Sequence, residues 1–164
     1  MVNVVRQLVR DDASDRPEYD AVVEVLTPSG PEAALDIEIR IRGNSRVAKC
    51  RYPPLSLDFP RSAVAGTVFE GQNRLKLVTL CAPQRQYHDY LALEYLVYRM
   101  LNELTERSFR VRWATVEYVA TDERRNRREA RVEPAFLIEE DWEVADRLGL
   151  EVLQVDSIET EALD

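Results

Sequence analysis

Lys76 is the residue of this 164-residue chain whose type and position most suggest chemistry. Only two of the 22 basic residues are lysines, Lys49 and Lys76, and Lys76 lies within the apolar run 74–79. A lysine carries a compact point charge whereas an arginine presents a planar fork, so the two side chains are not interchangeable. Codon bias explains the general excess of arginine. A lysine inside a predicted strand is nevertheless a candidate ligand for a phosphate group.

Glu94 is the second candidate, because a helical wheel places it on the predicted buried side of a long helix. That helix is predicted over residues 84–106, with Pro83 suited to its first turn. Its polar residues form one arc, the predicted solvent face: Arg85, His88, Arg99, Asn102, Glu103 and Glu106. Glu94 lies nearly opposite that arc, on the same side as four apolar residues: Leu93, Leu96, Val97 and Leu101. A buried carboxylate needs a partner, and we predict that Lys76 provides it.

A strand lysine held by a helix glutamate is the arrangement that positions nucleotide phosphates in protein kinases. The lysine supplies a charge for the phosphates, and the glutamate keeps that lysine in place. The same two residues are also compatible with a structural ion pair, or with Glu94 capping a loop amide, and with no ligand at all. The sequence therefore predicts a pair between Glu94 and Lys76 and leaves its purpose open.

The elements around these residues predict an α+β fold, with a mainly antiparallel sheet packed on one long helix. Residues 35–42 alternate between apolar and charged side chains, which is typical of a half-buried strand. The other predicted strands are 21–26, 55–59, 74–79, 109–118 and 135–138. A short helix over 142–148 is predicted to stop at Gly149. The charged segment 122–133 is predicted to be a solvated hairpin loop.

Length and charge narrow the class of protein. Residues 1–150 are predicted to form one domain, and residues 151–164 are an acidic tail or the start of a further C-terminal segment. The net charge of −8 argues against a general nucleic-acid binder, since phosphate affinity comes from a basic surface. No apolar run approaches the roughly 18 residues that a membrane-spanning helix needs. The first ten residues lack a signal-peptide pattern.

The cysteines and the single histidine exclude several kinds of site. Cys50 and Cys81 have no partner at the spacing of a zinc site, and His88 alone makes a Cys–His or Ser–His–Asp arrangement implausible. The two cysteines are either bridged or free and partly buried, and their positions next to predicted strands do not decide between these states. A bridge would indicate an extracytoplasmic bacterial protein, and free thiols a cytoplasmic one.

Five segments follow one another along the chain: Arg42-Gly43-Asn44-Ser45, the strand 55–59, the run 69–77, the helix segment 90–94 and the strand 135–139. In this order they resemble the spore-coat CotH family of atypical kinases, and more closely a group of bacterial proteins distantly similar to it. The resemblance covers residues 20–150. Only the Arg-Gly-Asn-Ser turn and the strand that ends in Glu139 are at all specific.

This resemblance implies a fold like the N-terminal lobe of a protein kinase. Lys76 would contact phosphates, Glu94 would hold Lys76, and the backbone around Glu139 would meet the nucleotide base at a hinge. It implies ATP and magnesium as cofactors of a full-length protein, with neither bound tightly by this chain. No Gly-x-Gly-x-x-Gly loop is present, and the catalytic and metal-binding carboxylates of such an enzyme are not found, so catalytic residues and metal ligands are not assigned.

Two functions therefore remain open. The chain is the nucleotide-binding half of a kinase-like phosphotransferase, incomplete and inactive by itself, whose partners are its own C-terminal lobe or a protein substrate. Alternatively, it is a non-catalytic α+β binding or structural module, in which the Glu94 pair serves only to orient the helix. A kinase-like fold that has kept its architecture and lost nucleotide binding lies between these two.

Overall fold

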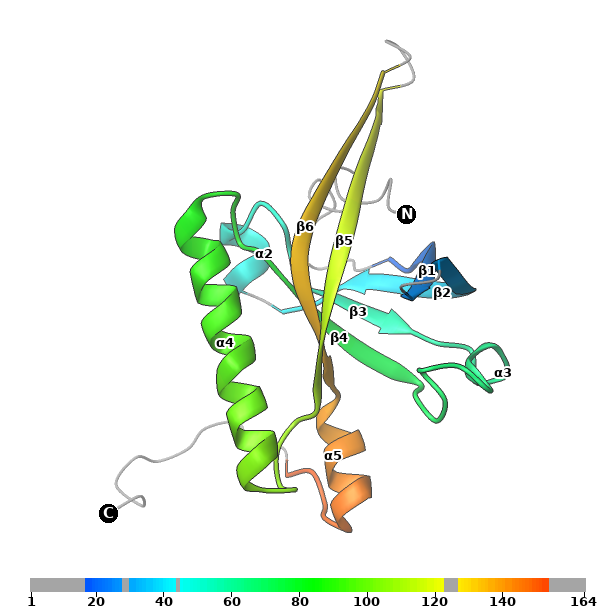
Figure 1. Ribbon diagram of the computed structural model, residues 1–164, viewed down its shortest axis with the longest axis vertical. Coiled ribbons are helices and arrows are strands. Elements are labelled where there is room, and N and C mark those ends of the chain that lie inside the picture. Colours follow the sequence, from blue (N-terminus) through cyan, green and yellow to red (C-terminus); the bar gives the residue numbers. More distant parts are fainter. Residues whose placement is uncertain (1–16, 28–29, 44, 123–126, 154–164) are drawn as a thin grey trace.

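Six antiparallel strands form one curled sheet, and a single long helix packs against it (Figure 1). The computed structural model describes residues 17–27, 30–43, 45–122 and 127–153. The strands are β1 (Tyr19–Thr27), β2 (Gly30–Ile41), β3 (Leu55–Asp58), β4 (Arg74–Thr79), β5 (Val111–Asp122) and β6 (Arg127–Glu139). Their order across the sheet is β1-β2-β3-β4-β6-β5. The predicted α+β class, a mainly antiparallel sheet with one long helix, is confirmed.

The alternation in β2 builds one wall of the core. Leu35, Ile37, Ile39 and Ile41 are all buried, whereas Asp36 and Glu38 between them are exposed. Ile39 is opposite Leu57 of β3, and Leu57 is opposite Leu75 of β4. Because residues opposite each other in a ladder point to the same face, these three side chains form one apolar row across the strands.

Among the described residues, four helices accompany the sheet: α2 (Ser45–Lys49), α3 (Arg61–Val64), α4 (Arg85–Leu104) and α5 (Asp141–Leu148). The short helices α2 and α3 were not predicted. Helix α4 lies along the sheet, and α5 lies beside the C-terminal end of α4 (Figure 1). Gly149 ends α5 in the left-handed conformation, with φ of 64°, as the glycine signal predicts. No helix among the described residues is long and apolar enough to cross a membrane.

Helix α4 contacts the sheet through tyrosines, and the predicted orientation of the helix is wrong. Leu91 is its only buried residue, and three half-buried tyrosines share that face: Tyr87, Tyr95 and Tyr98. The Tyr95 ring contacts Trp113 of β5 and Phe136 of β6. The apolar residues that the wheel places in the core are exposed instead: Leu93, Leu96, Val97 and Leu101. Asn102, at one edge of the predicted solvent arc, is bonded instead to the segment that precedes β5.

The hairpin of β5 and β6 extends further than the sequence predicts. Pairing continues from Val111↔Ile138 to Asp122↔Arg127, so most of the segment 122–133 is strand rather than loop. In Figure 1 this ribbon rises well clear of the other strands. The core part of the hairpin sets the register of β5 against β6, and the outer part continues it. Backbone hydrogen bonds hold this ladder together, and they do not depend on whether the side chains are charged. Charge along the chain is therefore a poor guide to where such a ribbon ends.

Candidate functional site

Lys76 occupies the middle of the sheet, on the strand between β3 and β6. Its side chain is only 10% exposed. The ammonium nitrogen lies 2.6 Å from Asp141 Oδ1 and 3.5 Å from Glu140 Oε2, both at the start of α5. The same nitrogen lies 5.2 Å from the ring centre of Phe109. Two carboxylates and an aromatic face therefore compensate the cost of burying this charge.

The side chain of Lys76 lines a pocket of about 330 Å³. Two further cations, Arg42 and Arg46, line it, together with the carboxylates Glu94 and Asp141. Three positive and two negative groups line the pocket, and the carboxylate of Glu140, 3.5 Å from the Lys76 nitrogen, balances the third positive charge. The remaining lining residues are uncharged: Gly43, Ser45, Pro54, Val78, Tyr98, Phe109 and Ile138. Three cationic side chains gathered in one concave site are groups that can bind an anionic ligand.

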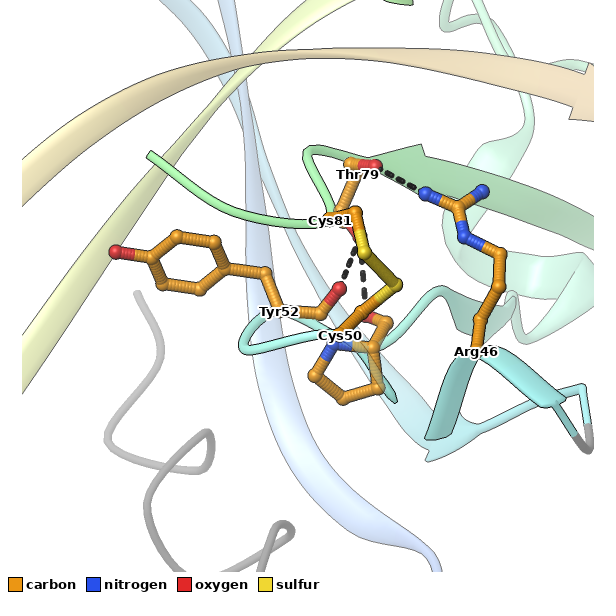
Figure 2. Close-up of a disulfide and its surroundings, with 6 residues drawn as sticks. Arg46, Cys50, Tyr52, Thr79 and Cys81 are labelled. Carbon is orange, nitrogen blue, oxygen red and sulfur yellow. Dashed lines mark hydrogen bonds between the residues drawn. A yellow bond between two sulfur atoms is a disulfide. The ribbon is translucent and has the colours of Figure 1, made fainter. Parts of the chain in front are cut away.

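A disulfide fixes α2, and with it Arg46, beside the end of β4 (Figure 2). Cys50, directly after α2, is bonded to Cys81, with Cα atoms 4.4 Å apart. The Arg46 Nη2 donates a hydrogen bond of 2.8 Å to the carbonyl oxygen of Thr79. The backbone N–H of Arg51 donates to the carbonyl of Cys81 at 2.8 Å. The bridge that the sequence left open is present, and it brings the Arg46 side chain to the pocket.

Glu94 is exposed at the rim of the pocket and forms no ion pair with Lys76, so the predicted pair is wrong. The cause is the orientation of α4, which turns its tyrosines to the sheet and its aliphatic side chains outwards. The charge of Glu94 affects Tyr98 instead. The pKa of the Tyr98 phenol is raised mainly because the phenol is partly buried, and the negative charge of Glu94 raises this pKa further. The two predicted residues therefore share one pocket without touching.

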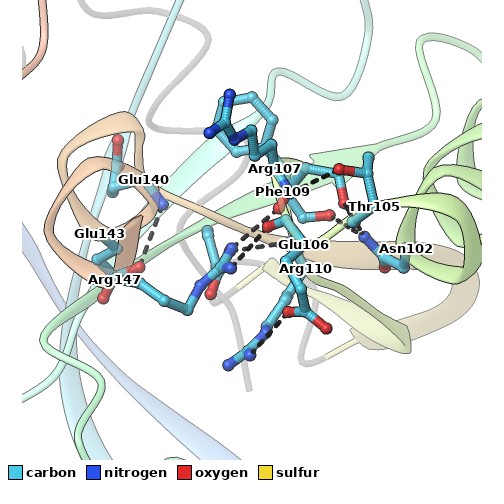
Figure 3. A network of polar contacts seen from close by, with 11 residues as sticks. Asn102, Thr105, Glu106, Arg107, Phe109, Arg110, Glu140, Glu143 and Arg147 are labelled. Atoms are coloured by element: carbon cyan, nitrogen blue, oxygen red, sulfur yellow. Dashed lines mark hydrogen bonds and ion pairs between the residues drawn. The ribbon is translucent and has the colours of Figure 1, made fainter. Parts of the chain in front are cut away.

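Glu139 is buried, with 6% of its surface exposed, and does not line this pocket. Its Oε2 accepts hydrogen bonds of 2.9 Å from the backbone N–H of Arg110 and from Arg147 Nη2. Arg147 also donates to the carbonyl oxygen of Glu106 at 2.9 Å (Figure 3). Glu139 thus joins α5 to the segment that follows α4. Its contact with a nucleotide base stays a prediction.

The residues that hold Lys76 were visible in the sequence but were not assigned to it. Glu140 and Asp141 follow a buried strand and precede a helix, and acidic residues are favoured at a helix N-terminus. Glu140 and Glu143 form a reciprocal capping box there (Figure 3). Burial raises the pKa of Glu143, although backbone hydrogen bonds oppose that shift. The separation of 65 residues between Lys76 and Asp141 hides their contact from any local pattern.

The chemistry of the pocket suits a phosphate group better than a metal ion. Among the described residues, no cluster of three or more histidine, cysteine or acidic side chains could hold a metal. One ammonium and two guanidinium groups are the donors that phosphate oxygens prefer.

Comparison of the chain with protein-family models, with curated proteins and with solved structures finds no match.

Proposed function

We propose that this chain is the nucleotide-binding half of a kinase-like phosphotransferase, and that the nucleotide phosphates occupy the Lys76 pocket. One observation carries the proposal. A buried lysine, held by two carboxylates, shares a concave pocket with Arg42 and Arg46, so that three cationic side chains meet at one site of an otherwise acidic protein. Burying a lysine is costly, and such a lysine is a common feature of functional sites.

Each residue of the pocket has a distinct task in this proposal. Lys76 contributes a compact charge, and the guanidinium groups of Arg42 and Arg46 bind oxygens in pairs. Asp141 and Glu140 orient Lys76, which is the task predicted for Glu94. ATP would supply the phosphoryl group, and magnesium would need acidic ligands from outside the described residues. Phosphoryl transfer needs the lysine and the metal-binding acids together, so we expect no transfer by this chain alone.

Two further observations support the proposal. The Arg-Gly-Asn-Ser turn, one of the two more specific motifs on which the resemblance to the CotH family rests, contributes Arg42, Gly43 and Ser45 to the pocket. The disulfide between Cys50 and Cys81 is typical of proteins in an oxidising compartment, which favours an extracytoplasmic location.

The test is ATP binding by the 164-residue chain, measured by isothermal titration calorimetry. We expect weak binding, and we expect Lys76→Ala to weaken it by about tenfold or more, because a charge-assisted contact is lost. Lys49→Ala is the matched control, since Lys49 is the other lysine and is exposed. Circular dichroism would confirm that both variants are folded. Equal ATP affinity in the two variants, or no ATP binding by the folded chain, would contradict the proposal.

The alternative is a non-catalytic binding module, and the close contact between Lys76 and Asp141 favours it. A lysine that already has an oxygen at 2.6 Å and another carboxylate at 3.5 Å is satisfied without a ligand. Asp141→Asn separates the two functions, because the Asp141 side chain is 63% exposed and removing its charge leaves Lys76 to an incoming anion. A phosphate site should then bind ATP about threefold more tightly. A purely structural pair would leave ATP binding undetectable.

A further inference from the structure

Helix α4 carries a second apolar stripe that faces solvent, which we name the α4 seam. The seam consists of Tyr90, Leu93, Val97, Met100 and Leu104. Their exposed fractions are 60%, 58%, 55%, 64% and 78%. A helix on a sheet normally hides its apolar stripe against the core. Here the tyrosine stripe does so, and the seam remains uncovered in the described part of the chain.

The spacing within the seam is that of a coiled coil. Its residues are separated by three, four, three and four positions, which places Tyr90, Val97 and Leu104 at heptad positions a, and Leu93 and Met100 at positions d. The seam is about 21 Å long, at 1.5 Å per residue. Two further exposed leucines widen it, Leu96 at position g and Leu101 at position e. A pattern of this kind suits another helix rather than a small ligand or a flat surface.

The charges beside the seam indicate what kind of helix fits. Asp89 and Glu103 occupy g positions and Glu94 occupies an e position, and all three are exposed. Glu103 has Arg99 one turn away at 3.6 Å. In a parallel pair of two copies, Asp89 would face Glu94 of the other copy; in an antiparallel pair, Asp89 would face the other Glu103. Like charges at these positions oppose self-association.

We propose that the α4 seam binds an amphipathic helix of a partner protein, with leucine or isoleucine at its own a and d positions and lysine or arginine at its e and g positions. The apolar residues of the partner would cover the seam, and its basic residues would pair with Asp89 and Glu94. This mode of recognition buries the a and d side chains for affinity and uses the flanking charges for selection. The proposal does not rest on nucleotide binding, although Glu94 also lines the Lys76 pocket.

Two synthetic peptides of about three heptads test the proposal. Both carry leucine at a and d; one carries lysine at e and g, and the other glutamate. Fluorescence anisotropy with the 164-residue chain should show binding of the lysine peptide, and binding of the glutamate peptide that is about tenfold weaker or less. The double variant Leu93→Ser, Val97→Ser should abolish binding. Its matched control is Val22→Ser, Val68→Ser, which changes two exposed valines outside α4.

A second pair of variants tests the role of charge and excludes general attraction to an acidic protein. Asp89→Lys with Glu94→Lys should reverse the preference, so that the glutamate peptide binds more tightly. Glu38→Lys with Glu70→Lys makes the same charge change at exposed positions outside α4 and should leave the preference unchanged. Equal binding of the lysine peptide by the seam variant and its control would overturn the proposal. So would self-association of the wild-type chain that Leu93→Ser and Val97→Ser abolish, measured by analytical ultracentrifugation.

Discussion

The two apolar faces of α4 have similar hydrophobic character but opposite surroundings. One face, with Leu91 and Tyr95, contacts aromatic rings of β5 and β6; the other, with Leu93 and Val97, is exposed. The rings of Tyr95 and Phe136 have centres 5.8 Å apart, and those of Tyr95 and Trp113 have centres 5.1 Å apart. A helix with two apolar faces can therefore support its own fold with one and remain available to a partner with the other.

The two faces of α4 should differ most in how much stability is lost when one leucine on each is truncated. Leu91 is 3% exposed and Leu93 is 58% exposed. Leu91→Ala should lower the free energy of unfolding by about 2–4 kcal/mol, since it removes apolar contacts and leaves a cavity. Leu93→Ala should change it by less than about 0.5 kcal/mol. Urea denaturation followed by circular dichroism measures both. Similar losses in the two variants would mean that the seam is covered after all.

A smaller difference is expected at the C-terminal end of the helix. Asn102 Nδ2 donates to Ser108 Oγ at 2.8 Å and to the carbonyl of Phe109 at 2.7 Å, which ties the helix to the segment leading into β5. Asn102→Ala should cost about 1–2 kcal/mol, because two partners lose their donor. Glu103→Ala removes only an exposed ion pair with Arg99 and should cost less than about 0.5 kcal/mol. Thermal unfolding would distinguish the two losses of stability. A larger loss in the Glu103 variant would contradict the idea that Asn102 ties the helix to the segment before β5.

The smallest expected effect is a pH dependence of stability that arises from Tyr98, on the sheet-facing side of α4. Burial, and then the charge of Glu94, raise the pKa of Tyr98 above its ordinary value of 10.0. The folded chain therefore keeps a phenol proton that the unfolded chain releases, and the associated stability is lost as pH rises above about 10. Tyr98→Phe should thus gain stability relative to the wild type between about pH 9 and 11. Tyr90→Phe on the seam serves as the control variant.

The same titration contains an internal check. Because the charge of Glu94 contributes to the raised pKa of Tyr98, Glu94→Gln should lower that pKa and shift the phenol absorbance titration to lower pH. Burial remains in this variant, so the shift should be partial. An unchanged titration would show that Glu94 lies too far from Tyr98 to act on it.

The strands were predictable from the sequence because their signal is local. Alternation in residues 35–42 is a period-two pattern, and the structure buries the residues that it marks. The orientation of α4 was not predictable in the same way. A wheel separates polar from apolar residues, but it cannot say which of two apolar stripes faces the sheet. The rings of Tyr95 and Tyr98 pack against Phe136, a long-range contact that no spacing reveals.

The candidate site was predicted only in part, because only part of its signal is local in the sequence. Lys76 was found because a lysine in an apolar strand is unusual within one short window. Its partners Glu140 and Asp141 lie at the start of α5, 64 and 65 positions after Lys76 in the sequence, and their proximity depends on the pairing of β4 with β6. Glu94 was chosen by the same wheel that misplaced α4. The local pattern therefore singled out a lysine that lines a pocket, but the wheel gave it the wrong partner.

The bond between Cys50 and Cys81 also has a mechanical consequence. These residues are 31 positions apart in sequence, and the segment between them contains β3, α3 and β4, including Lys76. A chain pulled from its two ends would transmit the load through the disulfide and leave that segment unstretched. With the bond intact, the fully extended chain should be shorter by about 110 Å, at roughly 3.5 Å per residue. Single-molecule stretching with and without a reductant would show this hidden length as one additional extension step.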